Sequence, residues 1–405
     1  MTITSSFSPY QKLLIGLLAV LLFTVVVDYM LLSALSAILL PELQITTQQF
    51  GLLVSAYAFS AGISGILTSG FADKFDRKKL LLFYYGGFLL GMLLSATANS
   101  LTTLLIARIV TGIFGGVVAS ICFAIVSDLF EVDQRGRVMG FVHMAFAASQ
   151  IIGLPAGLYL ANNFDWHTTY WMIALLGIVS LAVVFYKIKP IRAHLHVPGK
   201  DNPFNHFLKT LKNRDYLTVF FNNILLVLAD VMFMTFGSAY STNNLGVSLD
   251  DLPLLYGATG VSTLLFAPII GRLADRFGKL KVFIYGTGLA VILVGIYSHL
   301  GATPFWLVVT LHTLLFMGVN ARMISSSALA TVVPKAQDRG AFMAVDASLQ
   351  QVSGGVAAAA AGLIVHQSSD GVIHQYPALG WAVIGLMVVT IGLMVAINGI
   401  VKGRG

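Results

Sequence analysis

Twelve apolar stretches, each long enough to cross a lipid bilayer, constrain this chain more than any other feature of its sequence. A helix needs roughly 20 apolar residues to cross a hydrocarbon core about 30 Å thick. Backbone groups in lipid must be satisfied within the segment, and these runs are too long for barrel strands, so we predict twelve transmembrane helices. The predicted spans are 13–41, 50–70, 80–99, 101–127, 138–161, 169–187, 217–241, 253–271, 281–299, 305–330, 341–365 and 378–401.

The composition excludes the soluble classes of protein. Charged residues make up 10% of the 405 residues and apolar residues 57%, whereas a soluble domain has about 25% and about 45–50% respectively. The single cysteine, Cys122, excludes a disulfide framework and a cysteine-cluster metal site. We therefore expect neither a metal nor another cofactor.

The basic residues are distributed on one side of the predicted membrane. Of the 24 Lys and Arg residues, 22 lie near the N-terminus or after an even-numbered span, and two lie inside spans. The loops between the other spans carry only acidic charges. Because cytoplasmic loops carry the excess of Lys and Arg, we predict that both termini are cytoplasmic. We expect the protein to lie in a bacterial plasma (inner) membrane. We expect no cleaved signal peptide. This asymmetry explains the net charge of +7 without nucleic acid as a partner.

The two halves of the sequence repeat each other. The string SGFADKFDRKK at 69–79 recurs as GRLADRFGKLK at 271–281, and the same offset of 202 places Asp28 over Asp230. We predict an N-terminal six-helix bundle at 1–187, a cytoplasmic linker at 188–216 that is partly helical at the membrane surface, and a C-terminal six-helix bundle at 217–405. Parallel repeats of this kind occur in transporters whose substrate site lies between the halves near the midplane.

The repeated loop resembles the signature loop of the major facilitator superfamily, G-x-x-x-D-R/K-x-G-R/K-x-R/K. The second copy, residues 271–281, fits closely, whereas the first copy has Ser69 and Asp76 at the two glycine positions. The segments LLIARIVTGIFGG around Arg108 and GFVHMAFAASQIIGLPAG around Pro155 resemble the drug/proton antiporter branch of that family. The resemblance covers the whole chain. It implies the twelve-helix major facilitator fold, alternating access, a central cavity and proton-coupled export.

Ionisable residues inside the predicted spans are candidates for proton coupling, because each costs roughly 2.5–3.5 kcal/mol to insert. Asp28 and Asp230 lie at similar depth near the middle of the bilayer, and we expect both to face a water-filled chamber between the bundles. Burial raises the pKa of a carboxylate and a nearby arginine lowers it, so Asp28 and Asp230 can each load and release a proton. The alternative is that each only orients its helix. The five deep ionisable residues are Asp28, Arg108, Asp230, Arg322 and Asp346.

Arginine inside a membrane must face a partner or water, because it keeps its charge at any accessible pH. For Arg108 we expect a role in proton coupling, with hydrogen bonding to exposed carbonyls as the structural alternative. Arg322 and Asp346 lie at equal depth on neighbouring spans and carry opposite charges, so we predict a buried ion pair between them. Such a pair either serves as a gate or proton site, or is a static strut.

Two further sets of residues are candidates for gating and for the substrate path. The signature loops join helices on the cytoplasmic side, where charged groups can lock neighbouring helix ends together. The gating candidates are Asp73, Lys74, Arg77, Asp128, Asp275 and Arg276. Polar and aromatic residues inside spans are candidates for lining the cavity, with helix-to-helix hydrogen bonding as the alternative; they are Tyr29, Tyr57, Gln150, Asn222 and Gln350. We expect a structural role for His143 and His312.

Together these patterns predict a monomeric secondary transporter in which residues 1–187 rock against residues 217–405. Protons would drive export of a small organic molecule, such as an amphipathic drug or a sugar-like metabolite. The alternatives are a proton-coupled importer of an organic anion and a transport-dead sensor on the same fold. We do not expect an enzyme, because the sequence has no phosphate-cradling G-x-x-x-x-G-K-S/T, no nucleophile elbow and no H-E-x-x-H.

Overall fold

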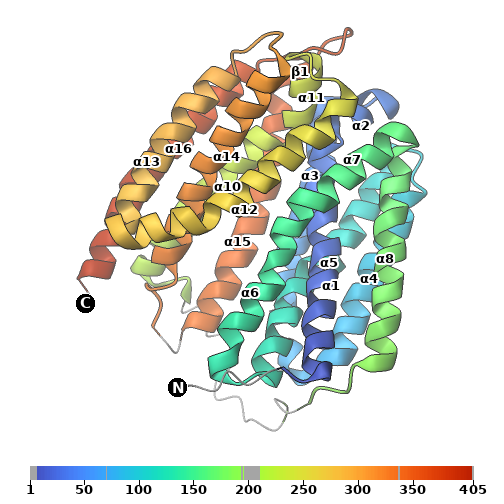
Figure 1. Ribbon diagram of the computed structural model, residues 1–405, viewed down its shortest axis with the longest axis vertical. Helices are drawn as coiled ribbons and strands as arrows, with labels where there is room; N and C mark the ends of the chain where they lie inside the picture. The colour runs from blue at the N-terminus through green and yellow to red at the C-terminus, as the bar shows by residue number, and fades with distance from the viewer. Residues whose placement is uncertain (1–6, 70, 193–194, 196–209, 336–337, 404–405) are drawn as a thin grey trace.

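The computed structural model describes residues 7–69, 71–192, 195, 210–335 and 338–403, which form two bundles of long helices (Figure 1). The first bundle contains α1 (Pro9–Ala34), α2 (Ser36–Glu42), α3 (Thr47–Ser69), the 3₁₀ turn η1 (Ala72–Lys74), α4 (Arg77–Ala96), α5 (Leu101–Leu129), α6 (Val132–Ala148), the π-helical turn η2 (Ser149–Gly153), α7 (Leu154–Asn163) and α8 (Trp166–Lys187). The second contains α10 (Arg214–Met234), α11 (Gly237–Asn243), the 3₁₀ turn η4 (Leu249–Asp251), α12 (Leu252–Phe277), α13 (Lys279–Tyr297), α14 (Phe305–Ala330), α15 (Arg339–Ile364), β1 (His366–Gln367), β2 (Ile373–His374) and α16 (Tyr376–Lys402).

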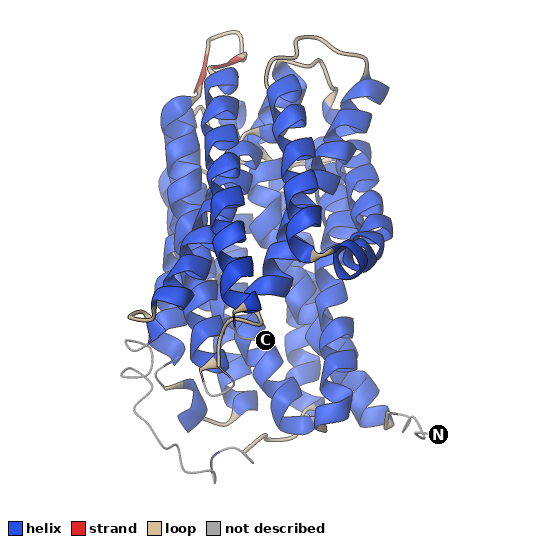
Figure 2. Cartoon of the chain, turned by 90° about the vertical axis from the view of Figure 1, so that its left-hand side faces the viewer, coloured by secondary structure: helices blue, strands red, loops and turns tan. Residues whose placement is uncertain are grey.

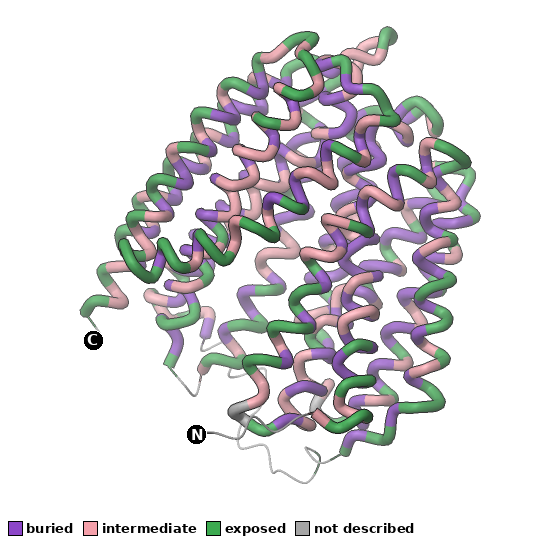
Figure 3. The backbone as a smooth tube through the Cα atoms, in the orientation of Figure 1, coloured by how far each residue is buried: buried purple, intermediate pink, exposed green. Residues whose placement is uncertain are grey.

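All twelve predicted spans are helical, which confirms the predicted fold class. Eleven of the helical segments in the described part of the chain are long and apolar enough to cross a membrane. The twelfth, α15, has 26 residues but carries Asp346, Gln350 and Gln351. It packs against α3 and α10, so its polar side chains have other helices as partners. Figure 3 shows buried residues along the faces between helices and exposed residues on the outside, where a lipid-facing surface would lie.

Three of the predicted spans are interrupted helices. The first span breaks between α1 and α2 at Leu35, and its counterpart in the second half breaks between α10 and α11. The fifth span widens into η2 directly before Pro155. Proline has no N–H and its ring clashes with the carbonyl four residues earlier, so the widened turn is where the helix accommodates it.

The ends of the bundle differ in charge. We call the end that carries both chain termini the basic end, and the end that carries loops 43–46, 164–165, 244–248, 298–304 and 365–375 the acidic end. The short hairpin β1–β2 lies at the acidic end (Figure 2). Most of the predicted linker 188–216 lies outside the described residues, so its predicted surface helix stays a prediction.

The two bundles are held together in the half of the molecule next to the acidic end. The Thr47 hydroxyl donates to the carbonyl of Val365 over 2.7 Å, and the Ser55 hydroxyl donates to that of Gly355 over 2.7 Å. Among the described residues, the other hydrogen bonds between bundles lie in the same half, from Thr47 to Gly362, from Ala239 to Ser36 and from Asn162 to Leu249. The ribbons of the two bundles diverge toward the basic end (Figure 1).

Two glycines make the closest of these approaches possible. A Cβ on Gly362 of α15 would lie 2.6 Å from the Thr47 carbonyl oxygen, and one on Gly51 of α3 would lie 2.7 Å from the Ala358 carbonyl oxygen. Any side chain at either position would push α3 and α15 apart. The acidic end is therefore closed by direct backbone packing between the bundles.

Candidate functional site

The first bundle contains a fully buried carboxylate–arginine pair. Asp28 on α1 and Arg108 on α5 lie 2.6 Å apart between Oδ1 and Nη1, and their side chains are 0% and 1% exposed. The Arg108 guanidinium lies 4.6 Å from the centre of the Tyr57 ring, and Tyr57 packs against Tyr29 with ring centres 5.6 Å apart. Within the part of the chain that the structure describes, Asp28 Oδ2 and Arg108 Nε have no hydrogen-bond partner, so this pair uses only part of its bonding capacity.

The second bundle contains the equivalent pair. Asp230 on α10 and Arg322 on α14 lie 2.9 Å apart between Oδ1 and Nη1. The Arg322 side chain is 0% exposed, whereas that of Asp230 is 14% exposed. Two donors of Arg322, Nε and Nη2, are buried and have no hydrogen-bond partner among the residues described. Each bundle thus places one acid on its first helix opposite an arginine on its fourth spanning helix.

The predicted ion pair between Arg322 and Asp346 is wrong. Arg322 pairs with Asp230, and Asp346 instead accepts hydrogen bonds from the amide nitrogens of Asn223 and Gln350 over 2.8–3.1 Å. Depth along a helix is readable from the sequence, but the face on which a side chain lies depends on how the helices pack. Arg322 faces α10, so equal depth with Asp346 does not bring the two together.

The expectation that Asp28 and Asp230 both face a water-filled chamber fails for Asp28 in this conformation. Asp28 is enclosed by α1, α5 and the Tyr57 side chain, with no exposed side-chain surface. Asp230 keeps some exposed side-chain surface. The two carboxylates therefore differ in access, although they occupy equivalent positions in the repeat.

The residues predicted to line the cavity lie in three places. Tyr29 and Tyr57 belong to the Asp28–Arg108 site, and Tyr29 also reaches across to the second bundle, where its hydroxyl oxygen lies 3.7 Å from the place of a Cβ on Gly354. Asn222 and Gln350 lie beside Asp346. The backbone of Gln150, in η2, packs directly against Gly260 of α12, so Gln150 lies at the contact between bundles.

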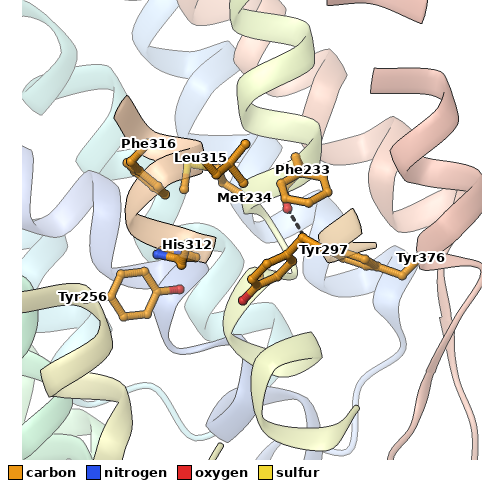
Figure 4. A pocket seen from close by; sticks show the side chains of 9 residues that line it. Phe233, Met234, Tyr256, Tyr297, His312, Leu315, Phe316 and Tyr376 are labelled. Carbon is orange, nitrogen blue, oxygen red and sulfur yellow. Dashed lines mark hydrogen bonds between the residues drawn. The ribbon is translucent and has the colours of Figure 1, made fainter. Parts of the chain in front are cut away.

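An aromatic pocket in the second bundle was not predicted from the sequence (Figure 4). It lies among α10, α12, α13, α14 and α16 and is lined mainly by rings, those of Phe233, Tyr256, Tyr297, Phe316 and Tyr376, with His312 at one side. The Tyr376 hydroxyl donates to the Phe233 carbonyl over 2.8 Å, the dashed line in Figure 4. The number of tyrosines inside the later spans was a signal for such a pocket.

The histidine of this pocket is fixed by a neighbouring helix. His312 Nδ1 lies 2.8 Å from the Thr259 hydroxyl, which joins α14 to α12. This contact agrees with the structural role expected for His312.

The first signature loop holds a compact cluster of charges at the basic end. Two of the gating candidates meet here: Arg77 Nε lies 2.9 Å from Asp128 Oδ2 and joins the start of α4 to the end of α5. Asp76, which occupies the place of a family glycine, caps α4 through the Lys78 N–H and accepts hydrogen bonds from the Ile191 N–H and from Arg192 Nε. The departure from the motif thus attaches the beginning of the linker to the first bundle.

The second signature loop is looser in this structure. Asp275 is 78% exposed and lies 3.9 Å from Lys279 of the next helix, and Arg276 lies over its neighbour Phe277. Lys74 of the first loop is exposed, and the side chain of Asp73 lies outside the described residues. The gating role of these six residues stays a prediction.

The chemistry that this arrangement offers is proton and ion exchange. The described residues contain no group of three or more His, Cys, Asp or Glu side chains placed to hold a metal. A buried acid opposite an arginine can bind a proton, which neutralises the carboxylate and breaks the ion pair. The arginine is then left without its counter-charge. Such a change of charge can favour one packing of the helices over another.

Comparison with known proteins places the chain among transporters. A family model described as Major Facilitator Superfamily matches residues 17–238 and again residues 219–401. The uncharacterized MFS-type transporter YbcL of Bacillus subtilis is 23% identical over 366 residues, which are 90% of this chain and 92% of that protein. The Bicyclomycin resistance protein homolog of Haemophilus influenzae is 24% identical over 306 residues, 73% of this chain and 74% of that protein.

Solved structures share the fold. A peptide transporter, POT, superposes with a TM-score of 0.76 at 14% identity over 96% of this chain and 95% of that one. A bacterial homolog of the human lysosomal transporter Spinster, in an inward-facing and occupied conformation, superposes with a TM-score of 0.72 at 13% identity over 98% and 97% of the two chains.

Proposed function

This chain belongs to the major facilitator superfamily and is a secondary transporter, and we propose that it exports small organic molecules in exchange for protons. The observation that carries the proposal is the pair of equivalent acid–arginine contacts, Asp28–Arg108 and Asp230–Arg322, inside the two bundles. Each acid holds its arginine when charged and releases it when protonated. A proton that enters from outside would therefore change the packing of α1 against α5 or of α10 against α14.

The difference in exposure between the two acids suggests an order of events. Asp230 is partly exposed in the conformation that is closed at the acidic end, so we assign to Asp230 the proton exchange with the basic end. Asp28 would exchange its proton in the opposite conformation, after α3 and α15 separate. With both termini in the cytoplasm, as the Lys and Arg distribution predicts, the present conformation faces inward, like the related Spinster homolog structure.

Two observations support the proposed direction of transport and the proposed kind of substrate. One relative is named for resistance to bicyclomycin, which favours export of a drug-like molecule. The five deep ionisable groups are three acids and two arginines, so their balance is negative and favours neutral or cationic cargo. We propose that the substrate is an amphipathic neutral or cationic compound, or a sugar-like metabolite.

Flux into sealed vesicles tests this proposal. Proteoliposomes that contain the purified chain are given an imposed pH gradient, and uptake of ethidium and of bicyclomycin is measured. Exchange predicts that outward-directed protons drive uptake of at least one probe. Uptake driven by inward-directed protons would instead indicate import and would contradict exchange.

A further inference from the structure

A separate polar cluster lies in the second bundle next to the Asp230–Arg322 pair. We define the amide cluster as Asn222 and Asn223 on α10, Ser326 on α14, and Asp346 and Gln350 on α15. Asn223 Nδ2 lies 3.0 and 3.1 Å from the two carboxylate oxygens of Asp346, and Gln350 Nε2 lies 2.8 Å from Oδ2. The Asp346 carboxylate thus accepts from α10 and from its own helix, and Ser326 of α14 joins the cluster through Asn222 and Asn223.

The charge of this carboxylate is not balanced by a basic side chain. Asp346 is 7% exposed, and among the described residues its partners are the neutral amides of Asn223 and Gln350. A buried charge without a counter-charge is far more costly than a paired one. Asp28 and Asp230 are each paired with an arginine. The charge of Asp346 must instead be compensated by a bound cation or neutralised by a proton.

The amide and hydroxyl groups around Asp346 can supply oxygen ligands, which favours a metal cation over a proton. Asn222 is fully buried, and its Oδ1 has no hydrogen-bond partner in the described part of the chain. Its Nδ2 donates to the Ser326 hydroxyl over 2.9 Å. A proton needs one acceptor, whereas carboxylate, amide and hydroxyl oxygens together are the ligands that hard cations take. One carboxylate with neutral oxygens balances a single positive charge. We infer that the amide cluster is a binding site for a monovalent cation, Na⁺.

The amides can present oxygen to the cation by turning in place. The Asn223 nitrogen now faces the carboxylate at 3.0 and 3.1 Å. Asn223 Oδ1 now accepts from the Ser326 hydroxyl and from Asn222 Nδ2, each over 3.3 Å. A half turn of the amide group gives up these two long bonds, places the nitrogen where the Ser326 hydroxyl can accept, and puts the oxygen beside the carboxylate. That separation suits two oxygens around one cation with bonds of about 2.3–2.6 Å, the length given for Ca²⁺, which has a similar radius. Gln350 is half-buried, so the cation would enter from its side of the cluster.

The site lies close enough to the Asp230–Arg322 pair to be coupled to it. Ser326 follows Arg322 by one helical turn on α14, and Asn223 precedes Asp230 by two turns on α10, so both contacts use the same helix faces. A cation in the cluster adds positive charge near Arg322. It would therefore favour the charged form of Asp230, which is the counter-charge of Arg322.

Cation-dependent stability of the purified full-length chain tests the site. Thermal unfolding is followed in detergent at pH 8 and constant ionic strength while NaCl, KCl or LiCl replaces choline chloride. Because a ligand that binds only the folded state stabilises it, we expect a saturable rise in Tm with Na⁺. In Asp346→Asn, which keeps the shape and removes the charge, the Na⁺ midpoint should rise at least tenfold.

Matched variants separate the site from a general effect of salt. Asn222→Ala should weaken the Na⁺ response about tenfold, whereas Asn320→Ala, which removes an amide on α14 that bonds Thr263, should leave it unchanged. Binding of ²²Na⁺ to wild type and Asp346→Asn provides the second measurement if a variant unfolds early. Equal Tm values in Na⁺ and choline, with a response to pH alone, would overturn the inference.

This experiment is independent of the proposed proton exchange. It uses neither a substrate nor a gradient, so a failure of export in vesicles leaves the binding result standing. Conversely, a chain that exchanges protons for substrate without any Na⁺ response would keep the proposed function and remove the cation site.

Discussion

The partner of Arg322 is the structural result that departs most from the sequence, and a double-mutant cycle tests it. At an effective dielectric constant of about 20, two unit charges separated by the 2.9 Å between Arg322 and Asp230 attract by about 6 kcal/mol, which is an upper bound because the charges are spread over both groups. Breaking a buried pair by removing one partner costs about 3–5 kcal/mol. We expect Asp230→Asn alone to destabilise the chain by about 3 kcal/mol.

The cycle needs the single and double variants of two pairs. Unfolding by SDS in mixed micelles is followed by tryptophan fluorescence. The first cycle consists of Asp230→Asn, Arg322→Gln and the double variant. The second cycle replaces Asp230→Asn with Asp346→Asn. Coupling energies within membranes are moderate, about 0.6 kcal/mol on average for hydrogen bonds and at most about 1.7. For a charged pair whose arginine is fully buried and whose acid is 14% exposed, we expect a coupling energy of at least about 1 kcal/mol between Asp230 and Arg322.

The second cycle serves as the control. Among the described residues, Arg322 and Asp346 share no direct contact, so the coupling energy of the Arg322–Asp346 cycle should be smaller than that of the Asp230–Arg322 cycle. Coupling of more than about 1 kcal/mol between Arg322 and Asp346, with none between Arg322 and Asp230, would refute the pairing and with it the equivalence of the two bundles.

Three more outcomes follow from the contacts of other residues. Asp28→Asn should destabilise the chain by about 3–5 kcal/mol because it leaves Arg108 buried and unpaired, and adding Arg108→Gln should recover most of the loss in SDS unfolding. Gly362→Leu should separate α3 from α15 and raise maleimide labelling of a Thr47→Cys probe at least tenfold. The control variant Gly288→Leu, where a Cβ meets open space, should not change the labelling. Equal labelling of both variants would contradict closure at the acidic end. Burial opposes the charge of Asp76, but the hydrogen bonds from Arg192 and from the Ile191 and Lys78 N–H groups outweigh it and lower its pKa. Its stabilising effect is therefore present above its ordinary pKa and is lost as the pH falls through the lowered one, so Asp76→Ala should cost about 1 kcal/mol at pH 7 and progressively less in acid.

The sequence was sufficient for the helices and for the repeat because both depend on local properties. Apolar length fixes where a chain can cross a membrane, and the offset of 202 between Asp28 and Asp230 predicted that they occupy equivalent places. Arg77 and Asp128, which the structure pairs, were both foreseen as gating candidates, because both lie at helix ends on the same side. The breaks at Leu35 and before Gly237 were not, since neither position carries a proline.

Helix rotation is the property that the sequence could not supply. Arg322 and Asp346 lie on the two helices that were predicted, but the packing of α14 turns Arg322 toward α10, and Asp346 is bonded by amides instead. The same uncertainty hid the aromatic pocket, whose rings come from five helices separated by up to 143 residues in the chain. The enclosure of Asp28 depends on which conformation the bundles adopt, and a single sequence encodes more than one.

Proton movement by the purified transporter tests the central claim most directly. Proteoliposomes loaded with the pH-sensitive dye pyranine are exposed to a transported probe such as ethidium, and the change in internal pH is recorded for wild type and for Asp28→Asn/Asp230→Asn. The account predicts that probe flux moves protons in the opposite direction in wild type and that the double variant loses this proton movement. Undiminished, probe-dependent proton movement in the double variant would contradict it.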